Sequence, residues 1–224
     1  MPLSEKSKKR IHNKWPVARE GLPFILIGMA FFLIFLFIGI LPLIFLFGIL
    51  CLFTIFFFRD PERTHDVDKD AVLTPADGKV IGIHHLKGSD NPLGKPSLKL
   101  SVFMSLFNVH VNRMPLKGKI LNISHYPGRF FSAHLDKASE QNENNRVTLQ
   151  TEDGQTVVIV QIAGLIARRI ACWIGEGDTV TAGQRYGLIR FGSRLDIYLP
   201  IETRVVTEMN HYVKAGKTVL GYLS

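Results

Sequence analysis

The sequence contains few of the residues and motifs on which metal, redox and nucleotide chemistry usually depend. Its 224 residues include two cysteines, Cys51 and Cys172, which do not form a paired metal or redox motif. No two of the eight histidines are four residues apart, and there is no glycine-rich phosphate loop, His-Glu-x-x-His motif or serine-hydrolase elbow. We therefore expect two buried thiols without a disulfide, and no metal site.

Charge is absent from one long segment near the amino terminus. Residues 21–58 contain no Asp, Glu, Lys or Arg, and most of them are Leu, Ile or Phe. A membrane span needs about 20 apolar residues, so this segment is long enough for two short spans. Gly39, Pro42 and Gly48 interrupt its middle, and this pattern predicts a hydrophobic hairpin. One long tilted helix with a kink at the proline is the alternative.

Positive charge is concentrated on both sides of this segment. The formal net charge of +8 favours a polyanionic partner, either nucleic acid or an anionic membrane surface. The basic residues that flank the segment are Lys6, Lys8, Lys9, Arg10, Lys14 and Arg19 before it, and Arg59 and Arg63 after it. The rest of the chain lacks the aromatic and basic pattern of ribonucleoprotein domains, so we expect a cell membrane and no nucleic acid. Basic residues at both ends predict that both flanks of a hairpin, and the body that follows, lie on the cytoplasmic side.

The remainder of the chain is rich in β signals. Short β-leaning apolar runs separated by glycine turns occupy residues 71–75, 80–83, 98–107, 109–112, 117–123, 147–151, 157–162 and 205–213. The turns at 75–80 and 175–180 resemble those of hammerhead barrels, and the glycines of 177–184 stand where a positive φ is expected. Helical signal in this part is confined mainly to residues 132–139. We predict a mainly β (α+β) fold, with a compact sandwich or barrel-like body at 59–224, a basic flank at 1–20 and a membrane segment at 21–58.

The segment at residues 190–200 combines a strand pattern with a reactive peptide bond. Apolar and polar side chains alternate over residues 195–199, which is the pattern of a half-buried strand. Gly192 and Ser193 stand just before this alternation, so neighbouring backbone can hold their peptide bond in one conformation. Because glycine has no Cβ, the Ser193 hydroxyl can approach the Gly192 carbonyl carbon with least hindrance.

Two other side chains are candidates for acid or base chemistry. A lone histidine is most often a surface or satisfied core residue, but His110 stands in an alternating segment where it shares a face with Asn108 and Asn112. That arrangement predicts a polar site lined from one strand. Asp77 belongs to an Asp-Gly pair, which by itself is typical of a turn.

Four segments occur together in the order and approximate spacing of a known family. They are residues 75–78, 106–115, 131–134 and 191–194. On these motifs the chain resembles the phosphatidylserine decarboxylases, in particular their short bacterial and archaeal form, over nearly all of residues 58–223. It departs from the longer members at Phe191 and Arg194, which flank the Gly-Ser pair, and at Arg113, where the longer members carry a second histidine.

The resemblance implies a self-cleaving proenzyme. In that family the protein cuts its own Gly-Ser bond, so this chain would yield residues 1–192 and 193–224, which stay associated. Ser193 would become the covalent pyruvoyl cofactor, with His110 as the base and Asp77 as the carboxylate that orients it. The pyruvoyl group would form a Schiff base with phosphatidylserine, release carbon dioxide and leave phosphatidylethanolamine, without a metal.

A lipid substrate agrees with a membrane segment that holds the site at the bilayer surface. The lipid phosphodiester needs hydrogen-bond donors, for which Arg194, His134 and Lys137 are candidates. A non-enzymatic, membrane-anchored hammerhead adaptor is the alternative function, although it gives no reason for the four motifs. An ether-lipid analogue or a soluble amino acid is the alternative substrate, and homo-oligomerisation and acyl-chain preference are left open.

Overall fold

The computed structural model describes residues 5–64, 66–128, 141–164, 169–190 and 192–224. The described chain divides into two units. Residues 13–62 form a helical unit, and the remaining residues form a β-rich body. The short helix α1 (Glu5–Ile11) belongs to the body.

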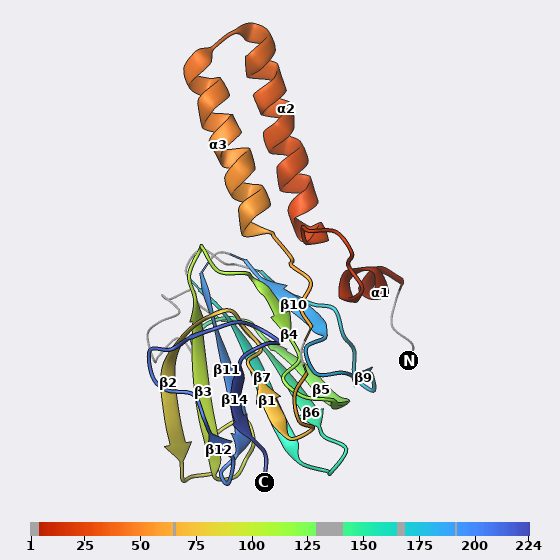
Figure 1. Cartoon of the computed structure of the whole chain (residues 1–224), viewed down its shortest axis with the longest axis vertical. Coiled ribbons are helices and arrows are strands. Elements are labelled where there is room, and N and C mark those ends of the chain that lie inside the picture. Colours follow the sequence, from red (N-terminus) through yellow and green to blue (C-terminus); the bar gives the residue numbers. More distant parts are fainter. Residues whose placement is uncertain (1–4, 65, 129–140, 165–168, 191) are drawn as a thin grey trace. The chain divides into compact units, whose positions relative to one another are not determined.

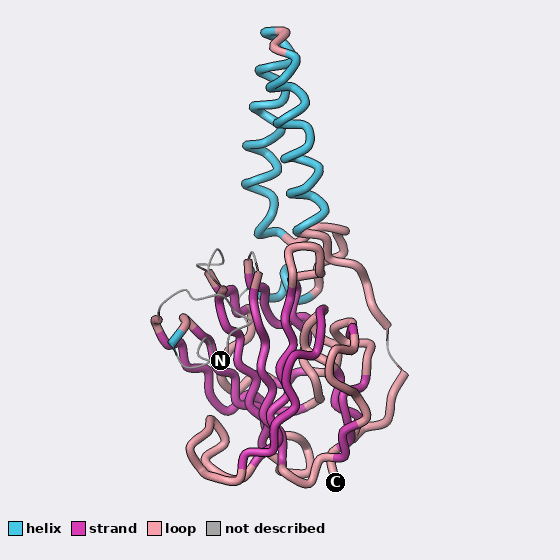
Figure 2. Tube along the Cα trace, turned by 90° about the vertical axis from the view of Figure 1, so that its left-hand side faces the viewer, coloured by secondary structure: helices cyan, strands magenta, loops and turns pink. Residues whose placement is uncertain are grey.

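The helical unit is a hairpin of two apolar helices. A short 3-10 turn, η1 (Arg19–Gly21), leads into α2 (Leu22–Ile38), and α3 (Leu41–Phe57) follows. Gly39 ends α2 in the left-handed conformation, with a φ of 81°, and its N–H donates to the Phe35 carbonyl. The helices lie side by side and run in opposite directions (Figures 1 and 2), and the Phe47 ring stacks on Phe31 and Phe35 at centroid distances of 5.1 and 5.2 Å. The structure therefore has two packed helices here and not one long kinked helix.

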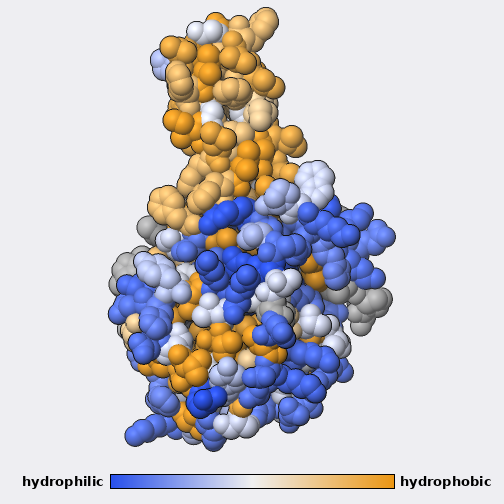
Figure 3. All heavy atoms as spheres, in the orientation of Figure 1, coloured by the Kyte–Doolittle hydropathy of each residue, from blue (hydrophilic) through white to orange (hydrophobic). Residues whose placement is uncertain are grey.

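The face of this hairpin that Figure 3 shows is almost entirely hydrophobic. Residues 19–38 form a helix that is long and apolar enough to cross a membrane by length and composition, while α3, at 17 residues, is apolar but shorter. At the base of the hairpin, the Asn13 amide donates to the Asp60 carboxylate at 3.0 Å, and Val17 and Arg59 form a β-bridge. So large an apolar surface is unfavourable in water, and the helical unit is therefore consistent with membrane association.

The body is built from antiparallel strands, which confirms the predicted mainly β fold. The strands are β1 (Ala71–Leu73), β2 (Gly78–Leu86), β3 (Ser97–Met104), β4 (Val111–Arg113), β5 (Gly118–Tyr126), β6 (Asn144–Gln150), β7 (Thr156–Ala163), β8 (Ile170–Cys172), β9 (Thr179–Val180), β10 (Arg185–Ile189), β11 (Ser193–Pro200), β12 (Arg204–Val205), β13 (Tyr212–Val213) and β14 (Val219–Tyr222). The described strands form an eight-stranded sheet, in the order β13-β2-β3-β11-β7-β6-β5-β9, and two three-stranded sheets, β1-β14-β12 and β4-β10-β8.

The strand β11 lies inside the large sheet, between β3 and β7. Ser193, its first residue, is opposite Met104 on β3 and Ala163 on β7. All residues of β11 except the last are buried, so the prediction of a half-buried strand is wrong. The face that carries Tyr198 is covered as well, because apolar side chains of β7 and the partly buried Leu86 and Leu93 pack there.

Three further sequence predictions concern the turn glycines at 177–184, the segment at 205–213 and a helix at 132–139. The glycines of residues 177–184 do adopt positive φ, 85° at Gly177 and 69° at Gly183. The strand predicted over residues 205–213 is replaced by the two-residue strands β12 and β13, separated by a turn in which Asn210 has a φ of 70°. The helix predicted at 132–139 lies outside the described residues.

Candidate active site

The Gly192–Ser193 peptide stands where the chain passes from one sheet to another. It follows β10, which belongs to the β4-β10-β8 sheet, and opens β11 in the eight-stranded sheet. Gly192 has a φ of 67°, and, its two chain neighbours aside, no atom of the described residues lies within 4 Å of where a Cβ would be. Glycine therefore meets a conformational need at this position, in addition to leaving the carbonyl carbon accessible.

Ser193 is fully buried between β3 and β7. Its side chain is 0% exposed, and its hydroxyl faces the Met104 sulfur, with 3.9 Å between Oγ and Sδ. A thioether sulfur is a weak acceptor. The Ser193 hydroxyl is thus held in a closed space by a partner that competes only weakly for its proton.

His110 lies next to the end of β10. It is 0% exposed, and its carbonyl accepts the Ile189 N–H at 3.4 Å, three residues before Gly192. The predicted polar face is corrected by the structure. Asn108 belongs to the turn before the strand, where its Oδ1 accepts the N–H and O–H of Ser105, and the residues around His110 are buried irrespective of their alternation.

Asp77 is held by Arg63, which the sequence by itself identifies only as a basic residue that flanks the apolar segment. Both of its carboxylate oxygens accept from the Arg63 guanidinium, with 2.9 Å between Nη2 and Oδ2. The Ala215 N–H donates to the same carboxylate at 2.7 Å. The loop that carries Asp77 also contacts the strand after His110, because the Pro75 carbonyl accepts the Arg113 N–H at 2.9 Å. The carboxylate is therefore fixed in a loop beside β4.

A row of buried carboxamides leads from β6 to Ser193. Asn145 donates to Gln161 at 3.0 Å, Gln161 donates to Asn112 at 2.9 Å, and Asn112 donates to the Met104 sulfur at 3.6 Å. These polar side chains are at most 4% exposed. Each carboxamide fixes the orientation of the next, so the NH₂ group of Asn112 is directed at the sulfur that also accepts from Ser193. Gln161 was not predicted, and its signal is one amide inside the apolar strand β7.

The predicted phosphate ligand Arg194 lies on the opposite face of β11 from Ser193. Its guanidinium is buried and donates to Asp196 at 2.6 Å and to the Ser101 hydroxyl at 2.9 Å. It therefore has a carboxylate partner inside the fold. The other two candidates, His134 and Lys137, lie outside the described residues.

Two titratable side chains of the body have raised pKa values. Burial raises the pKa of the Cys172 thiol, against a smaller opposite effect of its hydrogen bonds to Ile174 and Asn145. Burial also raises the pKa of Tyr186 well above its ordinary value. The Tyr186 hydroxyl has no hydrogen-bond partner among the described residues. Both cysteines are free thiols, Cys51 buried and Cys172 partly buried.

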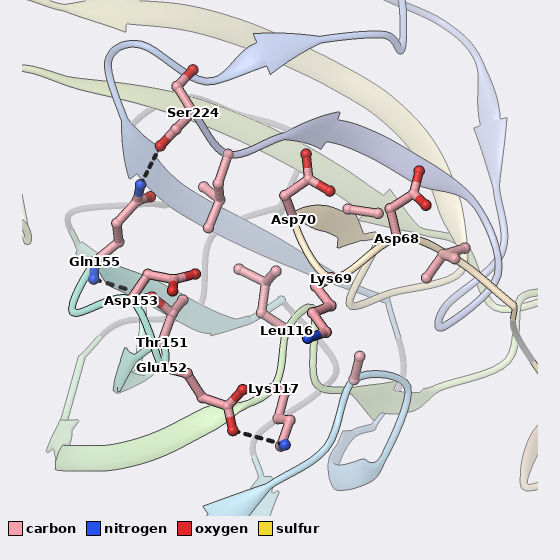
Figure 4. A pocket seen from close by; sticks show the side chains of 14 residues that line it. Asp68, Lys69, Asp70, Leu116, Lys117, Thr151, Glu152, Asp153, Gln155 and Ser224 are labelled. Atoms are coloured by element: carbon pink, nitrogen blue, oxygen red, sulfur yellow. Dashed lines mark hydrogen bonds and ion pairs between the residues drawn. The ribbon is translucent and has the colours of Figure 1, made fainter.

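A cavity of about 510 Å³ lies beside the turn before β7, at the end of the large sheet that is remote from the Gly192–Ser193 peptide (Figure 4). The turn at residues 151–155, which precedes β7, forms part of its wall, and this end of β7 is remote from the Ala163–Ser193 pair. At its rim the Lys117 ammonium pairs with Glu152 at 2.7 Å and lowers the pKa of that carboxyl. This cavity is therefore separate from the Gly-Ser junction. Within the described ranges, no three or more His, Cys, Asp or Glu side chains are grouped so as to hold a metal ion.

Comparisons with known proteins agree with this arrangement. The family model described as phosphatidylserine decarboxylase matches residues 50–221. A protein of Syntrophus aciditrophicus named phosphatidylserine decarboxylase proenzyme is 49% identical over 215 residues, covering 92% of this chain and 96% of that protein. Proteins of the same name from Desulfotalea psychrophila and Geobacter metallireducens are 48% and 46% identical, and cover 93% and 95% of this chain and 97% and 99% of their own lengths. The chain therefore belongs to the phosphatidylserine decarboxylase family.

Proposed function

We propose that this chain is a proenzyme that cuts itself between Gly192 and Ser193 and then decarboxylates phosphatidylserine to phosphatidylethanolamine. The observation that carries the proposal is a Gly-Ser peptide at the junction of two sheets, with a positive φ at Gly192 and a buried hydroxyl at Ser193, in a chain of this family. The products of cleavage would be residues 1–192 and 193–224. They would stay together because β11 pairs with β3 and β7.

The space around Ser193 fits a pyruvoyl group made from that serine. The group has no more heavy atoms in its side chain than serine, and the residue is already enclosed beside Met104 and Ala163. A ketone joined to an amide acts as an electron sink for the charge that decarboxylation leaves. The enclosure would shield that position from water.

Self-cleavage would need only atoms of the chain and one water molecule. The Ser193 oxygen attacks the Gly192 carbonyl carbon, the peptide C–N bond breaks and an ester forms. Loss of the Ser193 α-proton then expels the Gly192 carboxylate and leaves dehydroalanine, which water converts to the ketone and ammonia. His110 would accept the serine proton and pass it to the nitrogen of residue 193 as the C–N bond breaks. In the mature enzyme it would give a proton to the substrate carbon. Asp77 would orient His110 from its loop beside β4, with Arg63 holding the carboxylate.

The substrate would be drawn from the membrane that the helical hairpin enters. A diacyl lipid stays in the bilayer, so an anchored site is reached by lateral diffusion. That the body faces the cytoplasm stays a prediction from the flanking basic residues. That Arg194, His134 and Lys137 contact the lipid phosphate also stays a prediction. For Arg194 it would require the guanidinium to leave Asp196.

Mass spectrometry of the purified protein tests the cleavage. The wild-type chain should give two fragments, 1–192 and 193–224, the smaller one blocked to amino-terminal sequencing, and Ser193→Ala should stay whole. Carbon dioxide release from phosphatidylserine, an ether-lipid analogue and free serine then identifies the substrate. A wild-type chain that remains in one piece would contradict the proposal and favour the non-enzymatic adaptor.

A further inference from the structure

The second residue of β11 carries a long charged side chain that is almost completely buried. Arg194 is 1% exposed. Its Nε donates to Asp196 Oδ1 at 2.6 Å, and its Nη2 donates to the Ser101 hydroxyl on β3 at 2.9 Å. The other oxygen of Asp196 lies 3.3 Å from the ammonium of Lys99, also on β3. These contacts fasten the beginning of β11 to its neighbour by side chains as well as by backbone.

The surroundings of this ion pair make its contacts strong. Arg194 and Asp196 lie opposite Ile162 and Val160 of β7, so apolar side chains flank them and water screens them little. A buried charge that loses its partner is unfavourable. The guanidinium and the carboxylate therefore hold each other in place on this face of the sheet.

Cleavage would remove a covalent restraint from the beginning of β11, a step that rests on the proposed function. Before cleavage, the covalent chain through Gly192 restrains Ser193. After cleavage that link is gone, and a pyruvoyl group has no N–H, so Arg194 is the first residue that can donate to the ladder. Strand ends without covalent or side-chain restraint fray. The end that carries the reactive ketone would be the least ordered part of the strand.

We propose that Arg194 is a positioning residue that anchors the cut end of β11 through Asp196 and Ser101. The planar guanidinium binds two acceptors at once, which a lysine ammonium does not do in the same geometry. The anchor sits next to residue 193 but on the other face of the sheet, so it fixes the backbone without occupying the space of the substrate. Its contribution is small while the chain is intact and large once the chain is cut.

Two variants and one matched control isolate the anchor. Ser101→Ala removes one acceptor but leaves the Arg194–Asp196 pair, so the fold is retained. Arg194→Lys keeps the charge and removes the second hydrogen bond. The control is Ser97→Ala, because Ser97 is buried on the same strand, lies opposite Pro200 at the uncut end of β11, and has a hydroxyl without a hydrogen-bond partner among the described residues.

The experiment is native hydrogen exchange of the β11 peptide, followed by mass spectrometry, in the cleaved protein and in the uncut Ser193→Ala proenzyme. In the cleaved protein, Ser101→Ala and Arg194→Lys should accelerate exchange by roughly tenfold or more, the effect of one lost hydrogen bond to a charged group. In the uncut background the acceleration should be about threefold or less. Decarboxylation by Arg194→Lys should lose about tenfold in kcat, since the reactive end is misplaced, with the KM for phosphatidylserine nearly unchanged. Ser97→Ala should behave like the unsubstituted protein in each background.

The outcomes separate this inference from the proposed function. Equal acceleration in cut and uncut proteins would overturn the anchor and leave the decarboxylase assignment standing. A raised KM with normal exchange would also overturn it, and would support phosphate binding by Arg194. A wild-type chain that is never cut would overturn the proposed function, and the anchor with it.

Discussion

The guanidinium of Arg63 binds both carboxylate oxygens of Asp77. The same guanidinium donates to the Ala215 carbonyl at 2.7 Å, and the Ala215 N–H returns a hydrogen bond to Asp77. Three segments that are distant in sequence therefore meet at one ion pair: the start of the body, the Asp-Gly turn and the loop before β14. Because the pair is largely buried, it is shielded from solvent and fixes the geometry of the Asp77 loop.

Replacing Arg63 with leucine should destabilise the body and slow self-cleavage. Asp77 is 7% exposed, and a buried carboxylate without its partner lowers the free energy of unfolding by about 3–5 kcal/mol. Urea unfolding of the Ser193→Ala background measures the first effect, and a gel time course measures the second. Arg204→Leu is the control, because that guanidinium stacks over the Tyr222 ring at 4.7 Å and its loss should cost about 1 kcal/mol or less. Equal losses in the two variants would contradict the prediction.

His110 and Asp77 should act as one unit in cleavage. His110→Gln should slow it by about a hundredfold or more, the usual contribution of a general base. Asp77→Asn keeps an acceptor for the Ala215 N–H and removes the charge. The double variant should be little slower than the slower single variant, because removing either residue already disables the pair. Rate losses that simply multiply would show that Asp77 does not act through His110.

The carboxamide row predicts different effects for two adjacent asparagines on β6. Asn145 donates to Gln161, which continues the row toward Ser193, whereas Asn144 donates to the Asn142 carbonyl at 2.9 Å. Both are buried, so alanine at either position should destabilise the body by about 1–3 kcal/mol. Only Asn145→Ala should also slow cleavage in the folded fraction, which circular dichroism and a gel time course together measure. Equal slowing by Asn144→Ala would show that the carboxamide row has no specific effect on cleavage.

Alkaline pH should destabilise the body. The pKa values of Cys172 and Tyr186 are raised by folding, from ordinary values of 9.0 and 10.0. Above those values the unfolded state has lost protons that the folded state keeps, so the free energy of unfolding falls by up to about 1.4 kcal/mol per pH unit for each group. The two protonated groups make their full contribution to the free energy of unfolding below pH 9, and this contribution is lost as the pH rises.

The melting temperature between pH 7 and pH 11 measures this effect. Tyr186→Phe removes one of the two groups and should flatten the fall above pH 10. Tyr212→Phe is the control, because Tyr212 is 80% exposed and its removal should leave the profile unchanged. An identical profile for Tyr186→Phe and the wild type would show that this phenol does not titrate in the unfolding equilibrium.

The sequence by itself determined the broad organisation of this protein. A run of 38 residues without charge, at 21–58, predicts apolar helices irrespective of the rest of the fold, because lipid-compatible composition is a local property. The short apolar runs and glycine turns predict a mainly β body for the same reason. The order and spacing of the four motifs, at residues 75–78, 106–115, 131–134 and 191–194, were enough for the family resemblance, which the comparisons confirm.

Only the tertiary structure decided which faces are covered and which charges meet. Alternation in β11 tells which residues share a face, but whether that face is buried depends on segments such as Leu86 and Leu93 that pack against it. Asp77 binds Arg63, which lies 14 residues away, and Arg194 binds Ser101, 93 residues away on β3, in addition to its neighbour Asp196. Hydrogen bonds and ion pairs depend on distances of a few ångströms in the folded state, and no local pattern encodes them. For this reason the sequence could name Arg194 but could not show that its guanidinium points into the protein.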